Sequence, residues 1–224
     1  MTGQSRDYFR GRENQSAEKR ASPDTFAREA VRFTEDVDVI VHVLGYGNWQ
    51  RLLTDLRQRG FRESPEDDVI CRLRLPNALV GRDLLVDFMP DDEAILNFTN
   101  RWYRDALQTA ADHVLPSGTL IRVVTPSYFL ATKLEAYRGR GHNDPLGSHA
   151  IEDILAVVDG RDNLHTELSK AEPALQHYIA NALSALLAHR DFAYAVQSAA
   201  RQQPAREEII FQRLEAITAL PTAQ

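Results

Sequence analysis

Two aspartates at alternate positions, at the start of a valine-rich segment, constrain this chain more than any other feature. The segment Arg32–Val39 reads RFTEDVDV and contains Asp36 and Asp38. The β-branched residues over 37–44 predict a strand, and side chains two positions apart on a strand lie on the same face. The two carboxylates therefore point the same way. The valines that we expect on the opposite face, toward the core, are Val37, Val39 and Val41.

This pair of carboxylates predicts a metal site. Two ionised carboxylates a few ångströms apart repel each other unless a cation lies between them, and Mg²⁺ prefers one or two carboxylates together with phosphate oxygens. Such ions stabilise the attacking and leaving oxygens of phosphoryl transfer. Asp87 lies within the apolar strand segment LLVDFM, where a buried carboxylate needs a partner. The sequence therefore predicts a Mg²⁺ site made of Asp36, Asp38 and Asp87.

An Asp-x-Asp pair has other readings. A solvated strand edge or a turn is the ordinary alternative. The DxD motif of glycosyltransferases normally follows a nucleotide-sugar-binding α/β unit, and fewer than forty residues precede Asp36. That second alternative therefore lacks support.

A second group of candidate residues lies in the segment TKLEAYR, which ends a predicted helix. Lys133 and Tyr137 are four apart and share a face of that helix. A lysine there could bind a triphosphate as a point charge, and the Arg138 guanidinium could bind phosphate oxygens in a fork; a solvated surface lysine is the alternative. The next helix opens after Ser148, and its acidic residue Asp153 falls in the first turns, where the helix dipole favours anions anyway.

The chain divides into an α+β front half and an all-helical back half. Residues 1–21 are polar and aperiodic, which predicts a disordered tail, 22–125 form the α+β domain, and 126–224 the helical domain. A first helix begins near Ser22, and a hairpin turn lies between Asn77 and Gly81. The expected strands are 37–44, 69–75, 83–89 and 119–125. The expected helices are 48–59, 102–114, 128–137, 150–158, 164–169, 174–189 and 207–220.

The composition of the chain argues against several classes of protein. The net charge of −6 argues against a whole-protein basic field for nucleic acid, although local basic clusters such as Arg138–Arg140 exist. The single cysteine, Cys71, excludes a disulfide within the chain and a cysteine-based metal site. No apolar run is long enough to cross a membrane, and the N-terminus lacks the apolar core of a signal peptide. We therefore expect a cytoplasmic protein with no membrane partner.

Together these residues resemble the AbiEii/AbiGii-type nucleotidyltransferase-like family, which includes toxins of toxin–antitoxin and phage-abortive systems. The resemblance spans roughly residues 32–160. The segments that carry it are RFTEDVDV at 32–39, LVDF at 85–88, PSYFLATKLEAYR at 126–138 and HAIEDI at 149–154.

The resemblance implies a polymerase-β-like nucleotidyltransferase fold, a mixed sheet with helices, followed by an all-helical C-terminal domain. It implies transfer of a nucleoside monophosphate from an NTP with Mg²⁺, and partners that are a nucleotide, a tRNA or other RNA acceptor, and an antitoxin protein. Carried over, the metal ligands are Asp36, Asp38 and Asp87, and the remaining catalytic residues are Lys133 and Asp153. The nucleotide-binding residues are Thr34, Lys133 and Arg138. Whether Asp87 or Asp153 activates the acceptor hydroxyl stays open.

One departure from the family pattern matters. The superfamily places a Gly-Ser or Gly-Gly turn about ten residues before the first acid, where the backbone approaches the triphosphate. Here residues 24–29 read DTFARE, without a glycine. Three hypotheses follow: an active nucleotidyltransferase that modifies RNA, a degenerate member that acts as a binding or regulatory module, and a transferase acting on a small-molecule or protein hydroxyl.

Overall fold

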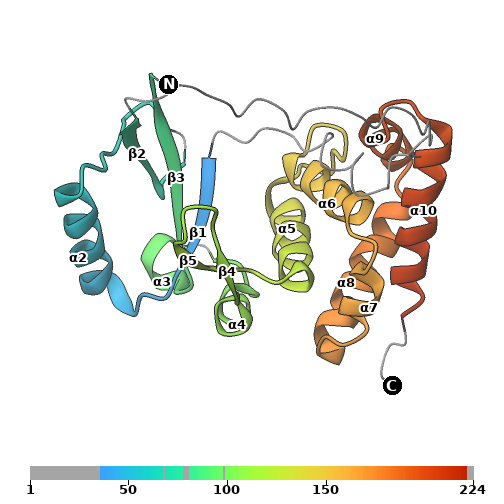
Figure 1. The fold of residues 1–224 in the computed structure, drawn as a ribbon, viewed down its shortest axis with the longest axis horizontal. Helices are drawn as coiled ribbons and strands as arrows, with labels where there is room; N and C mark the ends of the chain where they lie inside the picture. Colours follow the sequence, from blue (N-terminus) through green and yellow to red (C-terminus); the bar gives the residue numbers. More distant parts are fainter. Residues whose placement is uncertain (1–35, 68, 78–80, 98, 221–224) are drawn as a thin grey trace, which may run out of the picture.

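The computed structural model is an α+β fold in which a small mixed sheet precedes a group of helices (Figure 1). The structure describes residues 36–67, 69–77, 81–97 and 99–220. The predicted tail, the helix start at Ser22 and the predicted nucleotide contact Thr34 lie outside these residues.

The sheet has three strands in the order β1-β3-β2. These are β1 (Asp36–Val41), β2 (Arg72–Asn77) and β3 (Arg82–Pro90), with β1 parallel and β2 antiparallel to β3. The predicted hairpin between β2 and β3 is confirmed. Gly81, next to the start of β3, has φ of +68°, a conformation that costs glycine little because it has no Cβ.

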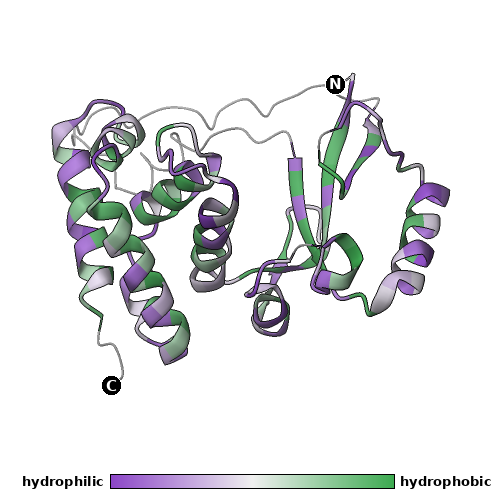
Figure 2. Cartoon of the chain, turned by 180° about the vertical axis from the view of Figure 1, so that it is seen from behind, coloured by the Kyte–Doolittle hydropathy of each residue, from purple (hydrophilic) through white to green (hydrophobic). Residues whose placement is uncertain are grey.

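One face of this sheet is apolar and is covered by α2 (Gly45–Gln58), with α3 (Glu93–Leu96) beside it (Figure 1). The alternation of side chains along each strand buries one face, and Figure 2 shows the strands as mixtures of apolar and polar residues. The buried residues of this core are Val43, Trp49, Leu53, Leu56, Leu73, Val86, Phe88 and Ile95.

The prediction that three valines of β1 face the core is only partly right. Val39 and Val41 pack against this core, but Val37 is 46% exposed, so the expectation that it faces the core is wrong. Val37 is paired with the core residue Val86, but as the second residue of β1 its own side chain is left half exposed.

The second half of the chain is helical, as predicted. Its long helices each begin near a proline or a serine, and Pro126, Pro173 and Pro204 stand in first turns, where a missing N–H costs nothing. The helices are α5 (Pro126–Arg140), α6 (His149–Gly160), α7 (Leu164–Leu168), α8 (Pro173–Leu187), α9 (Phe192–Ala199) and α10 (Pro204–Thr218). Their fully buried residues include Leu130, Ile151, Ile154, Ile179, Leu183, Ile210 and Leu214.

The two halves meet at the other face of the sheet, where α5 lies opposite α2 (Figure 1). Ile40 of β1 packs against the helical core. Trp102 and Ala106, at the start and in the middle of α4 (Tyr103–Thr109), are buried in that same core. The polar face of the sheet therefore looks toward α5, and this arrangement positions the site described below.

The predicted helix over 102–114 is wrong in its second half. α4 ends at Thr109, and Ala111–Val114 forms β4, paired antiparallel with β5 (Leu120–Val123). The Arg122 guanidinium of β5 donates to the carbonyl oxygens of Leu107 and Ala110 at 2.9 and 3.2 Å. These carbonyl groups lie at the end of α4, where they have no partner within the helix, and the Arg122 side chain supplies one. Because Arg122 belongs to β5, the pairing of β4 with β5 ends the helix. Helices α3 and α9 were not predicted from the sequence.

Candidate active site

Two of the candidate aspartates and one arginine stand in a row across the polar face of the sheet. Asp38 of β1 is paired with Asp87 of β3 in the parallel register, and Asp87 is paired with Arg72 of β2 in the antiparallel register. Directly paired residues share a face of a sheet. Asp36, two residues before Asp38, lies on the same face. The sheet thus brings together the three aspartates that the sequence predicted, with an arginine that it did not.

Arg72 bonds two of the three carboxylates. Its Nε donates to Asp87 Oδ1 at 2.7 Å, and its Nη2 to Asp87 Oδ2 at 2.9 Å and to Asp36 Oδ2 at 3.0 Å. The hydrogen bonds with Asp87 are the main reason why the pKa of the Arg72 guanidinium is raised. The Asp87 side chain is only 7% exposed, so it needs a partner. In this structure that partner is a guanidinium.

Lys133 of α5 joins the helical half to the same row. Its Nζ donates to Asp38 Oδ2 at 3.3 Å and lies 2.8 Å from Oδ2 of Asp153 on α6. Burial alone would lower the pKa of Lys133, but the hydrogen bonds and charges of Asp153 and Asp38 outweigh it and raise the pKa. The ammonium group is therefore charged and held between two carboxylates from different elements.

Six side chains, which we call the carboxylate row, gather on this face of the sheet. The row comprises Asp36, Asp38, Asp87, Asp153, Arg72 and Lys133. Four carboxylates and two cationic groups give a formal charge of −2 when all are ionised. Among the described residues, Oδ1 of Asp36 and Oδ1 of Asp38 accept no hydrogen bond, and the two side chains are 42% and 52% exposed. Carboxylate oxygens that face solvent are the ligands Mg²⁺ takes together with water and phosphate.

The fit differs for the third predicted metal ligand. Asp87 presents both of its oxygens to Arg72. Within the described ranges, no group of three or more histidine, cysteine or acidic side chains is arranged to hold a metal ion. Asp36 and Asp38 therefore fit a Mg²⁺ site with two carboxylate ligands, in which oxygens of the substrate would complete the coordination. That Asp87 is a third ligand stays a prediction.

The structure distinguishes between two arginines of α5. Both arginines are exposed, but the charge of Arg138, the predicted phosphate contact, acts on Tyr178. Arg140 was not predicted as a site residue. Its positive charge lowers the pKa of Cys71 and of Tyr103, and the charge of the Asp87 carboxylate raises the pKa of both. The reason is helical geometry, since a residue seven positions after Lys133 returns to about the same face whereas one five positions after it is turned away. The spacing was visible in the sequence.

Tyr103 is a second neighbour of the row that sequence reasoning missed. Burial, and then the charge of Asp38, raise the pKa of its hydroxyl to about 12. Tyr103 lies in the first turn of α4, next to the buried Trp102. No sequence signal marked it, because only the packing of α4 against β1 and α5 brings it here.

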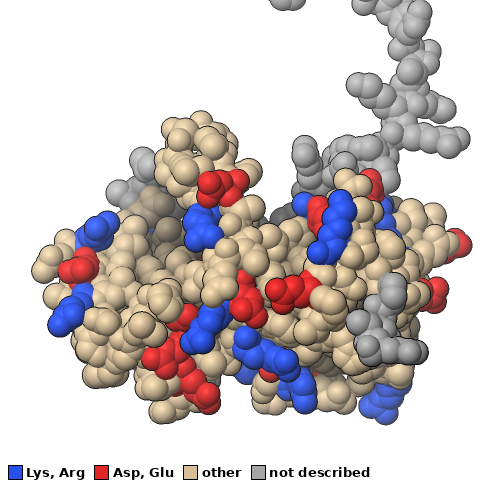
Figure 3. Space-filling view, turned by 90° about the horizontal axis from the view of Figure 1, so that it is seen from below, with Lys and Arg blue, Asp and Glu red and all other residues tan. Residues whose placement is uncertain are grey.

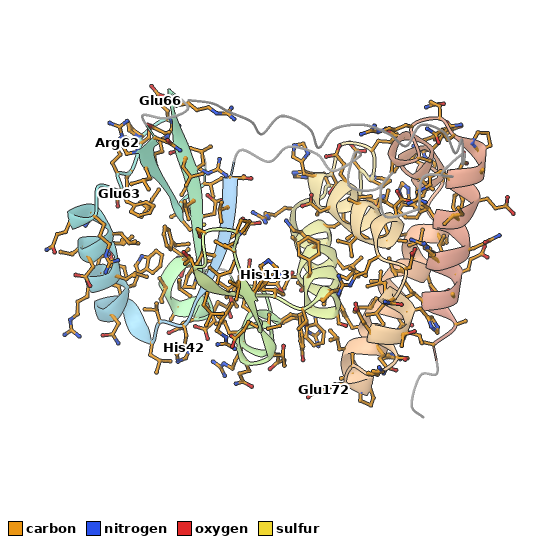
Figure 4. The ribbon with its side chains drawn as sticks, in the orientation of Figure 1. His42, Arg62, Glu63, Glu66, His113 and Glu172 are labelled. Carbon is orange, nitrogen blue, oxygen red and sulfur yellow. The ribbon has the colours of Figure 1, made fainter. Side chains whose placement is uncertain are left out.

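The polar groups at the other end of β1 form a separate pair. Nδ1 of His42 lies 2.7 Å from Oδ2 of Asp91, whose Oδ1 accepts from the amide of Val43 at 3.2 Å. Figure 4 shows His42 at the carboxyl end of β1, far from Glu66 at the opposite end of the sheet. The Asp91 side chain is almost fully buried. His42 and the amide of Val43 supply the hydrogen-bonding partners that this carboxylate needs, just beyond the ends of β1 and β3.

The surface seen in Figure 3 has acidic and basic side chains interspersed. The chain matches no family model and no curated protein sequence. In the part of the chain that the structure describes, every helix is too short or too polar to cross a membrane.

Proposed function

We propose that this chain is a Mg²⁺-dependent nucleotidyltransferase that transfers a nucleoside monophosphate from an NTP to an acceptor hydroxyl. The observation that carries the proposal is the Lys133 contact. Lys133 bonds both Asp38 and Asp153, which come from β1 and α6, on the sheet face where Asp38 stands beside Asp87. Lys133, the candidate cation for the triphosphate, thus lies within hydrogen-bonding distance of Asp38, one of the two exposed carboxylates, and of the candidate base Asp153.

Each group has a defined task in this proposal. Mg²⁺ held by Asp36, Asp38 and phosphate oxygens would neutralise charge that develops on the transferred phosphoryl group. Lys133 binds triphosphate oxygens as a point charge. Asp153, which lies 2.8 Å from Lys133 Nζ, would accept the proton of the acceptor hydroxyl. The acceptor oxygen would then bond the α-phosphorus, and the bond from that phosphorus to the oxygen bridging the α- and β-phosphates would break, so that pyrophosphate leaves. Asp87 is the weaker candidate for this base, because both of its oxygens accept from Arg72.

The acceptor and the biological role extend the same proposal. An RNA acceptor such as a tRNA, an antitoxin partner, a cytoplasmic location and a toxin-like effect come from the resemblance of residues 32–160 to the AbiEii/AbiGii-type family. The polymerase-β-like nucleotidyltransferase fold belongs to this proposal as well. The three-stranded mixed sheet with its carboxylates on one face supports it.

A second function deserves a test because of two specific observations. Arg72 holds two of the predicted metal ligands, and residues 24–29 lack the glycine turn that would approach a triphosphate. Both observations favour a degenerate member that binds a nucleotide or a protein without chemistry.

Label transfer separates the two functions. The protein is incubated with Mg²⁺ and each α-³²P-labelled NTP in turn, with total RNA as one acceptor pool and with RNA-depleted protein and metabolite extracts as others. We expect labelled product that Asp38→Asn abolishes and that Asp112→Asn, a change on the exposed β4 strand, leaves intact. Absence of transfer with all four nucleotides and all pools would favour the binding module.

A further inference from the structure

Strand β2 carries two arginines on one face, and they differ in one respect. Arg74 donates from Nε and Nη2 to the two oxygens of Asp67 at 2.9 and 2.7 Å. Arg72 donates in the same forked way to Asp87 at 2.7 and 2.9 Å, but its Nη2 also reaches Asp36 at 3.0 Å. Arg74 therefore makes an ordinary ion pair, whereas Arg72 bridges carboxylates from two different strands.

The position of this bridge has a chemical consequence. A divalent ion shared by Asp36 and Asp87 would have to lie between their oxygens, where the guanidinium now lies. The Arg72 side chain is 18% exposed and the Asp87 side chain 7%, so the ion would have to displace a largely buried group. A guanidinium cannot lose its proton in a protein, so it cannot leave the site by becoming neutral.

The remaining carboxylates are arranged differently. Oδ1 of Asp36 and Oδ1 of Asp38 have no hydrogen-bonding partner among residues 36–67, 69–77, 81–97 and 99–220, and both side chains face solvent. An ion bound by these two oxygens would leave the hydrogen bonds of Arg72, which go to Oδ2 of Asp36 and to Asp87, in place. Sites that use two ions place them about 4 Å apart across the reacting phosphate. Here Asp36 and Asp87, the carboxylates that a second ion would share, are already joined by the positive charge of Arg72.

We propose that Arg72 is a positioning residue that takes the place of a second divalent ion, so that the site binds one divalent ion, on Asp36 and Asp38. This inference rests on the proposed function. It assigns Arg72 the task of holding Asp87 and one oxygen of Asp36 while its charge offsets theirs.

Counting bound Mn²⁺ tests this assignment without relying on activity. Full-length protein is dialysed to equilibrium against Mn²⁺ and a saturating non-hydrolysable α,β-methylene NTP, with each of the four nucleotides in turn, and protein-bound Mn²⁺ is counted by atomic absorption. We expect one Mn²⁺ per wild-type chain. Arg72→Gln should bind two, because Asp87 and Asp36 then become available together, and Arg72→Lys, which keeps a positive charge, should stay at one.

Arg74→Gln is the matched control, since it removes a forked arginine–aspartate pair from the same face of the same strand, and it should also stay at one. Two Mn²⁺ ions per wild-type chain would overturn the inference, whether or not the variants fold. A count of one in an Arg72→Gln chain with wild-type circular dichroism would overturn it too. A wild-type count of zero with all four nucleotides would instead reject the proposed function, and the inference with it.

Discussion

Nζ of Lys133 lies 3.3 Å from Oδ2 of Asp38, a residue 95 positions earlier in the chain. This contact joins the first helix of the helical half to the first strand of the sheet. It also places a cation beside a carboxylate that is about half exposed, where a triphosphate with bound metal would compete for both partners.

Replacing Lys133 with methionine should weaken NTP binding at least tenfold. The variant keeps the aliphatic stem but removes the charge that we assign to the triphosphate. The free energy of unfolding should fall by about 1 to 3 kcal/mol, because Asp153, which is only 21% exposed, loses its cationic partner, whereas the half-exposed Asp38 is hydrated. Isothermal titration with Mg²⁺ and a non-hydrolysable NTP measures the first effect and thermal unfolding the second.

Lys170→Met is the control for this change, since Lys170 is exposed beyond the end of α7 and should leave binding unaltered. Equal NTP affinity in the Lys133→Met and Lys170→Met variants would remove Lys133 from the nucleotide site.

Arg140 and Arg138 should differ in their effect on NTP binding. Arg140 lies on the Lys133 side of α5 and its charge reaches Tyr103, whereas the charge of Arg138 acts on Tyr178. We therefore expect Arg140→Gln to weaken NTP binding three- to tenfold, by the loss of one attractive charge at the site, and Arg138→Gln to change it less than twofold. The reverse order, in the same titration, would favour the phosphate contact that the family resemblance assigns to Arg138.

The protein should lose stability between pH 9 and pH 11 because of Cys71. Burial, and then the nearby Asp87 carboxylate, raise the pKa of this thiol from 9.0 to about 11. In this range the unfolded chain loses the thiol proton while the folded chain keeps it, so the unfolded state binds fewer protons and stability falls as pH rises. The thiol accounts for up to about 2 to 3 kcal/mol of this loss.

Urea unfolding of the wild type and of Cys71→Ala at pH 8, 9, 10 and 11 measures this effect. The tyrosine hydroxyls titrate in both proteins, so the difference between the two curves isolates the thiol. Parallel curves for the two proteins would show that the thiol ionises as readily in the folded chain as in the unfolded one.

Arg206→Met should destabilise the fold by about 3 to 5 kcal/mol at pH 7. Arg206 of α10 forms a buried ion pair with Asp159 of α6 and donates from Nη2 to the backbone oxygen of Asp159 at 2.7 Å. Removing one member leaves a buried charge without its partner. Arg190→Met, at a side chain that is 89% exposed, should stay within about 0.5 kcal/mol in the same urea titration.

The cost of Arg206→Met should also depend on pH. Burial raises the pKa of Asp159, and Arg206 opposes that rise. Without the arginine, Asp159 protonates more readily in the folded chain than in the unfolded one, so the variant should recover part of its stability as pH falls toward 4. A penalty that is equal at pH 7 and pH 4 would mean that the loss comes from packing and the backbone hydrogen bond alone.

The sequence by itself determined which side chains share a face. The alternation of acids and valines put Asp36 and Asp38 together, and apolar spacing located the long helices, because both patterns depend only on the local period of a strand or helix. The α+β class and the helical second half followed in the same way.

Only the tertiary structure decided which partners these residues meet. Nothing near Arg72 in the sequence marks it, because strand register alone places it opposite Asp87. Pairing with β5 likewise turned Ala111–Val114 into a strand against its helical expectation. Lys133 was identified as a candidate from its helix, but its position between Asp38 and Asp153 depends on how α5 and α6 pack against the sheet. Contacts between residues far apart in the chain carry no local periodicity, which is why the carboxylate row became visible only in the folded protein.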